Sequence, residues 1–83
     1  MAKVKLTAEA AEGLEGLPLV VHARVLALLE RLGKWPAVSG AKLLTGNLAG
    51  HYRLRTGDYR LQFRLEGQTV VVEKIGHRDR FYE

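Results

Sequence analysis

The second half of the sequence concentrates side chains that bind phosphate. Six of the eight arginines lie after residue 50. Arg53 and Arg55 alternate with other residues in one segment, and Arg60 and Arg64 recur in the next, so each pair shares one face of a β-strand. The planar guanidinium group suits phosphate because it donates two parallel hydrogen bonds. The spacing therefore predicts an arginine-rich sheet face that binds a phosphate backbone, and RNA is the polymer that we expect.

The same face has an alternative explanation, because the polar side of an antiparallel sheet is always charged in some way. Arginines can serve there for solubility alone. The acids nearest to them in this part of the sequence are Asp58, in the turn between the two segments, and Glu66, at the end of the second. A face selected only for solubility is expected to mix both signs more evenly. The pattern therefore favours anion binding over a merely solvated face.

The composition indicates one small domain that spans residues 1–83. The 83 residues are 47% hydrophobic and 27% charged, which is typical of a globular protein. The net charge of +4 fits a polyanionic partner. The absence of cysteine excludes disulfides, thiolate chemistry and cysteine-ligated zinc. No signal peptide and no membrane-spanning apolar run are visible, so we expect a cytoplasmic protein without a membrane partner.

Hydrophobic periodicity predicts the elements that must position these side chains. An apolar stripe at helical spacing, bounded by Pro18 and Gly33, indicates a core-facing helix, and Gly13 is expected to break the helix before it. From residue 51 the period changes from helical to two, which indicates strands. The predicted order is a strand at 3–6, helices at 7–16 and 18–32, a loop at 33–50, and strands at 51–56, 59–66 and 69–75.

This order predicts an α+β fold. An N-terminal strand and a two-helix hairpin come first, and the hairpin packs on one face of an antiparallel sheet that ends in a three-stranded meander. We expect the first strand at a sheet edge or beside the last strand. Trp35 is expected to pack the loop onto the helices. The apolar set that faces the helices comprises Tyr59, Leu61, Phe63 and Leu65.

A resemblance to a known family rests on two stretches. Residues 42–60 read KLLTGNLAGHYRLRTGDYR, and residues 76–78 read GHR, followed by Tyr82 four residues after the arginine. These stretches closely resemble the centre and the last strand of the RelE/ParE superfamily of bacterial toxins. The order of strand, helical hairpin and meander also matches, so the resemblance spans almost the whole chain and implies a single RelE-like domain.

The resemblance implies a toxin of a type II toxin–antitoxin system. RelE-like members are endoribonucleases that cut mRNA in the ribosomal A site without a metal and so inhibit translation. ParE-like members of the same fold poison DNA gyrase. Both kinds are held inactive by a cognate antitoxin, which is usually encoded beside them. We therefore expect no cofactor and no metal, and as partners an antitoxin and ribosome-bound mRNA, with gyrase as the alternative.

Metal-free cleavage of RNA needs a base for the 2′-hydroxyl, cations around phosphorus and an acid for the departing 5′-oxygen. Arginine suits the second task, because its pKa lies far above neutrality. We expect Arg60, which matches an arginine implicated in catalysis in the family, to clamp the scissile phosphate. Arg78 matches a functional arginine of the last strand. The residues expected to assist in phosphate binding are Arg53, Arg55, Arg64 and Lys42.

The proton transfers fall to His51, His77 or Tyr82. Histidine titrates close to neutral pH as a residue type, and alternation places His51 on the face of the arginines. In the family this position holds a lysine or a glutamate in some nucleases, so the assignment of the base stays open. Tyr82 can stack on a base or assist proton transfer. The structural alternatives are a polar loop-edge role for His51, a tail hydrogen bond for His77 and anchoring of the C-terminus for Tyr82.

Three functions remain open at the level of the sequence. A ribosome-dependent mRNA endonuclease is favoured, because proton-transfer groups accompany the arginines. A gyrase inhibitor binds protein and needs no such groups. The third is a toxin fold that has lost its activity and only binds its antitoxin, for which an apolar groove along the second helix and the sheet edge is the expected surface.

Overall fold

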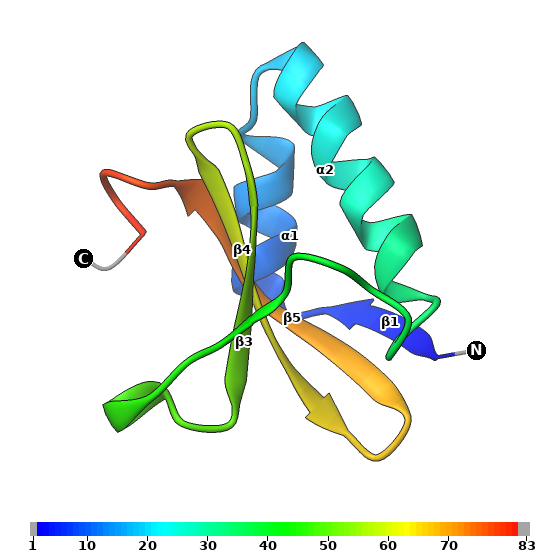
Figure 1. Cartoon of the computed structure of the whole chain (residues 1–83). Coiled ribbons are helices and arrows are strands. Elements are labelled where there is room, and N and C mark those ends of the chain that lie inside the picture. The colour runs from blue at the N-terminus through cyan, green and yellow to red at the C-terminus, as the bar shows by residue number, and fades with distance from the viewer. Residues whose placement is uncertain (1, 82–83) are drawn as a thin grey trace.

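The computed structural model describes residues 2–81, which form a five-stranded sheet with two α-helices on one side of it (Figure 1). The elements in chain order are β1 (Lys3–Leu6), α1 (Ala8–Glu15), α2 (Leu19–Leu32), β2 (Lys42–Leu43), a short 3-10 helix (Gly46–Leu48), β3 (His51–Thr56), β4 (Tyr59–Glu66) and β5 (Thr69–His77). Neither α-helix is long and apolar enough to cross a membrane.

The sheet order is β1-β5-β4-β3-β2. β1 runs parallel to β5 and lies at the edge of the sheet, while the other pairs are antiparallel. The α+β fold and the place of the first strand beside the last are therefore confirmed. β2 lies inside the segment predicted as a loop at 33–50, because two residues are too short to show a period of two. β5 continues to His77, two residues beyond the predicted end.

The core lies between the helices and one face of the meander. This is the face that the alternation of apolar residues predicts. Leu61 and Phe63 are fully buried, and Leu54 pairs with Leu61 across β3 and β4. Trp35 packs edge-on against Tyr52 and Phe63, with ring centroids 5.0 and 5.4 Å apart, so these ring contacts join the loop to β3 and β4 of the sheet and not to the helices. The face opposite the core is thereby left to the arginines.

Thr7 joins the start of α1 to β5. Its Oγ1 accepts a hydrogen bond from the backbone N–H of Ala10 at 3.1 Å, as a capping residue does, and donates one to the carbonyl oxygen of Glu73 at 2.9 Å. The backbone N–H of Thr7 also donates to the carbonyl of Val72. The side chain therefore fixes both the helix and the middle of the last strand.

β5 contains a bulge next to this contact. Gln62 pairs with Lys74, but the next residue of β4, Phe63, pairs with Val72, so Glu73 is an extra residue on β5. The bulge changes which side of the sheet successive side chains face. Val70 and Val72 point into the core before it, and Ile75 does so after it.

Gly13 does not break α1, contrary to the prediction. The helix runs unbroken from Ala8 to Glu15, and Gly13 faces β5. A Cβ atom at this position would lie 2.2 Å from the carbonyl oxygen of Ile75. Glycine is therefore needed because the backbones of α1 and β5 approach each other closely here.

Gly13→Ala is expected to lower the free energy of unfolding by about 1–3 kcal/mol. Displacement of α1 from β5 outweighs the roughly 1 kcal/mol that alanine gains over glycine within a helix. Urea unfolding of the purified protein measures this loss. Gly16→Ala is the matched control, because its Cβ would lie 3.6 Å from the nearest atom, and it should leave stability equal or higher. Equal stability of the two variants would contradict the close packing.

Candidate nucleic-acid interface

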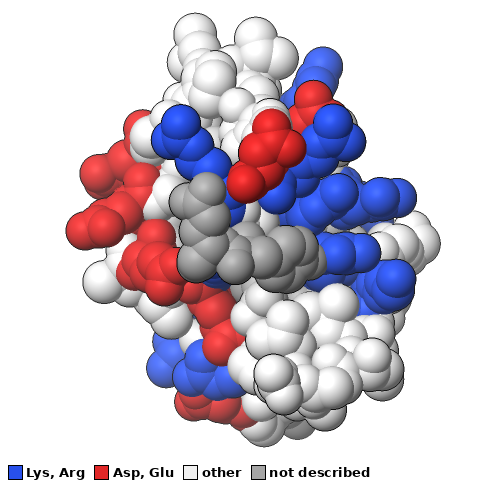
Figure 2. All heavy atoms as spheres, turned by 90° about the vertical axis from the view of Figure 1, so that its left-hand side faces the viewer, with Lys and Arg blue, Asp and Glu red and all other residues white. Residues whose placement is uncertain are grey.

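The arginines predicted to share a face do share it. Residues directly opposite each other in an antiparallel pair point to the same side of the sheet. Arg55 pairs with Arg60 across β3 and β4, and Arg53 pairs with Lys42 across β3 and β2. Figure 2 shows Lys and Arg side chains gathered in one patch, apart from a group of acidic side chains. Two cross-strand pairs of like charge therefore lie side by side on one exposed surface. We call this side of the sheet the arginine face; it carries Lys42, Arg53, Arg55 and Arg60.

A hollow of about 300 Å³ opens within this surface, at the edge of the sheet. It is lined by Gly40, Lys42, Arg53 and Arg55, and so by no acidic side chain among the described residues. Like charges placed together repel each other, and an anion between them removes that repulsion. The hollow has the charge and the size to hold a phosphate group.

Arg60 has an unsatisfied donor at the end of the arginine face near the β3–β4 turn. Its Nη1 is buried and makes no hydrogen bond within residues 2–81. Its partner on β5 is Gly76, and the ring of Phe81, which is only 1% exposed, lies 4.0 Å from the place where a Cβ of Gly76 would stand. Leaving a buried charged donor unpaired is costly, so Nη1 is suited to an acceptor brought by a ligand, such as a phosphate oxygen.

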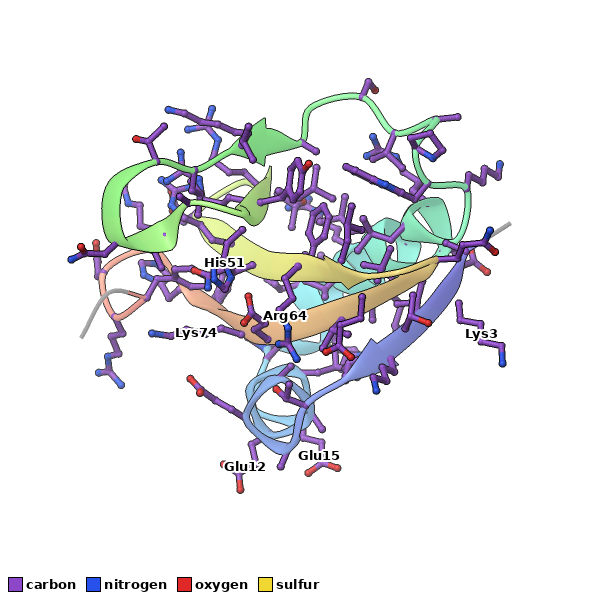
Figure 3. All side chains as sticks on the ribbon, turned by 90° about the horizontal axis from the view of Figure 1, so that it is seen from below. Lys3, Glu12, Glu15, His51, Arg64 and Lys74 are labelled. Atoms are coloured by element: carbon purple, nitrogen blue, oxygen red, sulfur yellow. The ribbon has the colours of Figure 1, made fainter. Side chains whose placement is uncertain are left out.

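Glu73, at the bulge, gathers the polar side chains at the other end of this face. Its Oε1 accepts hydrogen bonds from His51 Nδ1 at 2.5 Å and from Gln62 Nε2 at 3.3 Å, and its Oε2 accepts one from Arg64 Nη1 at 3.1 Å. Figure 3 shows His51 and Arg64 beside β5, whereas Glu12 and Glu15 extend from α1 away from the sheet. Both carboxylate oxygens of Glu73 are therefore engaged.

The environment of Glu73 keeps it ionised. Partial burial raises the pKa of its carboxyl group, but the three donated hydrogen bonds outweigh burial and hold the pKa below its ordinary value, with that from His51 contributing most among them. The ionised carboxylate in turn neutralises the positive charge at this end of the face.

Arg64 is committed to acidic partners. It donates to Glu66 at 2.5 Å as well as to Glu73, and its pKa is raised chiefly by the hydrogen bond to Glu66. The prediction that the acids near the arginines are only Asp58 and Glu66 is therefore wrong, because Glu73 also lies on this side. Arg64 is less available to a phosphate than Arg55 or Arg60.

His77 lies on the opposite side of the sheet from Arg60. It pairs with Tyr59, whose ring meets it edge-on at 5.0 Å, on the helix-facing side. Its Nδ1 accepts a hydrogen bond from the backbone N–H of Asp79 at 3.1 Å, which is the tail contact considered as its structural alternative. The structure thus separates His77 from the arginine face.

Arg78 stands beside the turn between β3 and β4. Its backbone N–H donates to the carbonyl of Asp58 at 2.8 Å, and its Nε lies 3.8 Å from a carboxylate oxygen of the same residue. The side chain is 56% exposed, so it can reach a ligand at the Arg60 end of the face. Tyr82 lies outside the described residues.

Sequence reasoning missed Glu73 as a member of the site. The only signal was an acid after three valines in a strand, and three consecutive valines show no alternation that would assign the acid to a face. Among residues 2–81, no group of three His, Asp or Glu side chains is arranged to hold a metal ion. The site therefore consists of arginines, one lysine and a carboxylate–imidazole pair.

Comparison with known proteins identifies the family. The sequence-family model that describes the ParE toxin of the type II toxin–antitoxin system parDE matches residues 4–82, nearly the whole chain. This chain belongs to the RelE/ParE family of type II toxins. The arginine face thus lies in a RelE/ParE toxin domain.

Individual relatives agree with this assignment. Toxin RelE3 of Methanocaldococcus jannaschii is 25% identical over 73 residues, which cover 84% of this chain and 83% of that protein. The toxin–antitoxin complex RelBE2 of Mycobacterium tuberculosis contains a chain that is 32% identical, with a TM-score of 0.81 over 93% of this chain and 98% of that one. The isolated RelE toxin of E. coli shares the fold, at 20% identity and a TM-score of 0.75 over 96% and 87% of the two chains.

Proposed function

We propose that this RelE/ParE toxin is a metal-free, ribosome-dependent mRNA endoribonuclease that inhibits translation. The observation that carries the proposal is the buried Nη1 of Arg60, which has no hydrogen-bond partner in residues 2–81, on a face that also holds Arg55 and His51. A guanidinium donor held ready in a partly dry site stabilises the charge that develops on phosphorus during cleavage. Relatives of this chain are named as a RelE toxin and as part of a RelBE toxin–antitoxin complex, which supports the RelE branch of the family.

Different parts of the arginine face have different roles in the proposed cleavage. The end near the β3–β4 turn carries Arg55, Arg60 and Arg78, which bind the scissile phosphate and the excess charge of its transition state. The hollow next to Lys42 and Arg53 holds a neighbouring phosphate.

The proton transfers take place at the edge of this charged surface. His51 is the candidate base for the 2′-hydroxyl, and water or Tyr82 is the source of the proton for the departing 5′-oxygen. His77 has no part in this assignment, because it faces the other side of the sheet.

Arg60→Ala is expected to lower the rate of mRNA cleavage on ribosomes by ~10²–10³-fold, the usual loss when one preorganised donor to a developing anion is removed. Mapping of mRNA 5′ ends after expression in cells, and on purified programmed ribosomes, measures the change. Arg24→Ala is the matched control, because Arg24 is an exposed residue of α2, and it should cleave as the wild type does.

Three outcomes would contradict the nuclease assignment. Equal toxicity of the wild type and the Arg60→Ala variant, without new 5′ ends, would sink it. Inhibition of DNA gyrase supercoiling by the purified protein, with no cleavage of mRNA, would assign the gyrase alternative instead. No growth defect on expression of the wild type would leave antitoxin binding as the remaining function.

We further propose that a cognate antitoxin covers the groove between β1 and α2. The groove has a volume of about 570 Å³, and its lining residues are apolar except for one: Val4, Leu6, Ala23, Leu26, Ala27, Leu29 and Glu30. Leu26 is 44% exposed in it. Within residues 2–81, no strand pairs with the outer edge of β1, so a partner strand or helix can add there.

Leu26→Asp is expected to weaken binding of the protein encoded beside this toxin by at least ~10-fold, because a charge enters an apolar interface. Isothermal titration calorimetry measures the affinity, and the unfolding curve should match that of the wild type. Leu43→Asp is the control, since Leu43 is 56% exposed on β2 at the opposite edge of the sheet. Equal weakening by both variants would contradict the assignment of this groove.

A further inference from the structure

We propose that Glu73 is a positioning residue, which orients the His51 imidazole so that Nε2 accepts the 2′-hydroxyl proton of the RNA. This inference rests on the proposed nuclease function and deepens it. The juxtaposition that carries it is a short hydrogen bond, 2.5 Å long, between His51 Nδ1 and Glu73 Oε1 on the arginine face. The two residues are 22 positions apart in the sequence and come from β3 and β5, on either side of β4.

The carboxylate decides which ring nitrogen carries the proton. An ionised carboxylate only accepts hydrogen bonds, so His51 Nδ1 must be the donor. In the neutral imidazole the proton then resides on Nδ1, and Nε2 keeps its lone pair. Nε2 is therefore the nitrogen that can take a proton from a substrate.

Glu73 is held too firmly to act as the base itself. Gln62 Nε2 donates to the oxygen that His51 uses, and Arg64 Nη1 donates to the other oxygen. The backbone is fixed as well, because Thr7 Oγ1 donates to the carbonyl of Glu73. The side chain of Glu73 is 18% exposed and that of His51 is 26% exposed, so the imidazole is the member of the pair that meets solvent more.

The position of His51 on β3 fits a role beside the phosphate subsites. His51 precedes Arg53 by two residues on the same face, a separation of about 7 Å along a strand. Arg53 lines the hollow assigned to a phosphate. The hollow is therefore the phosphate subsite nearest to the imidazole along β3.

In the proposed step one proton is transferred, one P–O bond forms and another P–O bond breaks. Nε2 of His51 takes the proton of the 2′-hydroxyl, and the 2′-oxygen forms a bond to phosphorus. The bond from phosphorus to the 5′-oxygen breaks, and that oxygen leaves with the electron pair and receives a proton from water or a general acid. The products are a 2′,3′-cyclic phosphate and a 5′-hydroxyl, and the imidazolium returns its proton to solvent.

The test compares Glu73→Gln with Glu66→Gln in single-turnover cleavage on programmed ribosomes. Glu73→Gln should lower the maximal rate by ~10²-fold, within the contribution of a positioned proton-transfer group, while the protein concentration for half-maximal rate changes by less than about threefold. Glu66→Gln also removes a carboxylate partner of Arg64 but does not touch His51, and it should cleave within about twofold of the wild type.

Two further measurements test whether Glu73 positions the His51 imidazole or only forms a structural ion pair with it. Adding Glu73→Gln to His51→Ala should cost no further rate, because Glu73 acts through His51. Nitrogen-15 NMR of the wild-type protein should show neutral His51 protonated at Nδ1, and this reading does not depend on any variant folding. Protonation of neutral His51 at Nε2 would overturn the inference.

The kinetic outcomes distinguish failure of the role proposed for Glu73 from failure of the proposed nuclease function. Cleavage by the wild type with an equally fast Glu73→Gln variant would overturn the role of Glu73 and leave the nuclease function standing. A loss of the same size in Glu66→Gln would also overturn it, since the effect would then come from loosening Arg64. Absence of cleavage by the wild type on programmed ribosomes would overturn the nuclease function, and the role of Glu73 with it.

Discussion

β5 contains one residue more than β4 between their paired positions, and the arrangement of both faces of the sheet depends on this bulge at Glu73. Val70 and Val72 fill the core before the bulge, and Ile75 fills it afterwards. The hydrogen bond from Thr7 to the Glu73 carbonyl fixes the bulge to the start of α1. The close approach of Gly13 to Ile75 then seats the same helix on the continuing strand. The strand can therefore supply the core and the arginine face at once.

The electrostatics of the arginine face follow from where Glu73 points. At the end with the bulge, Arg64 is paired with two carboxylates, and His51 is hydrogen-bonded to one of them. At the end near the β3–β4 turn, Arg55 and Arg60 lie opposite each other, and Arg60 keeps a buried donor without a partner in residues 2–81. The end with the bulge is thus internally neutralised, while Arg55 and Arg60 at the other end keep their positive charge, although Arg78 beside them lies 3.8 and 3.7 Å from carboxylate oxygens of Asp58 and Asp79.

Much of this arrangement could be predicted from the sequence, because it depends on local periodicity. Alternation placed Arg53, Arg55 and Arg60 on one face and the aromatic and aliphatic residues of the same strands in the core. The Thr7 cap and the turns at 57–58 and 67–68 are also encoded by residue type at fixed positions. These features need no knowledge of what packs against them.

The features that escaped prediction depend on contacts between distant segments. Gly13 was interpreted as a helix breaker, but its lack of a side chain serves the approach to β5. Unbroken alternation from Val72 would place His77 on the arginine face, and the bulge reverses this. The same bulge places Lys74 on the side of Gln62. A bulge leaves no periodic mark in the sequence, so these placements follow only from the assembled sheet.

The central claim is that the arginine face binds the RNA backbone, and the salt dependence of binding tests it most directly. The measurement is the affinity for ribosomes programmed with mRNA whose A-site riboses are 2′-O-methylated, determined at several salt concentrations for the wild type, Arg60→Gln and Arg24→Gln. We predict that Arg60→Gln makes the fall of log affinity with log salt shallower by about 0.7 to 1, the value for one lost phosphate contact, and that Arg24→Gln leaves it unchanged. An Arg60→Gln slope equal to that of the wild type would contradict the account.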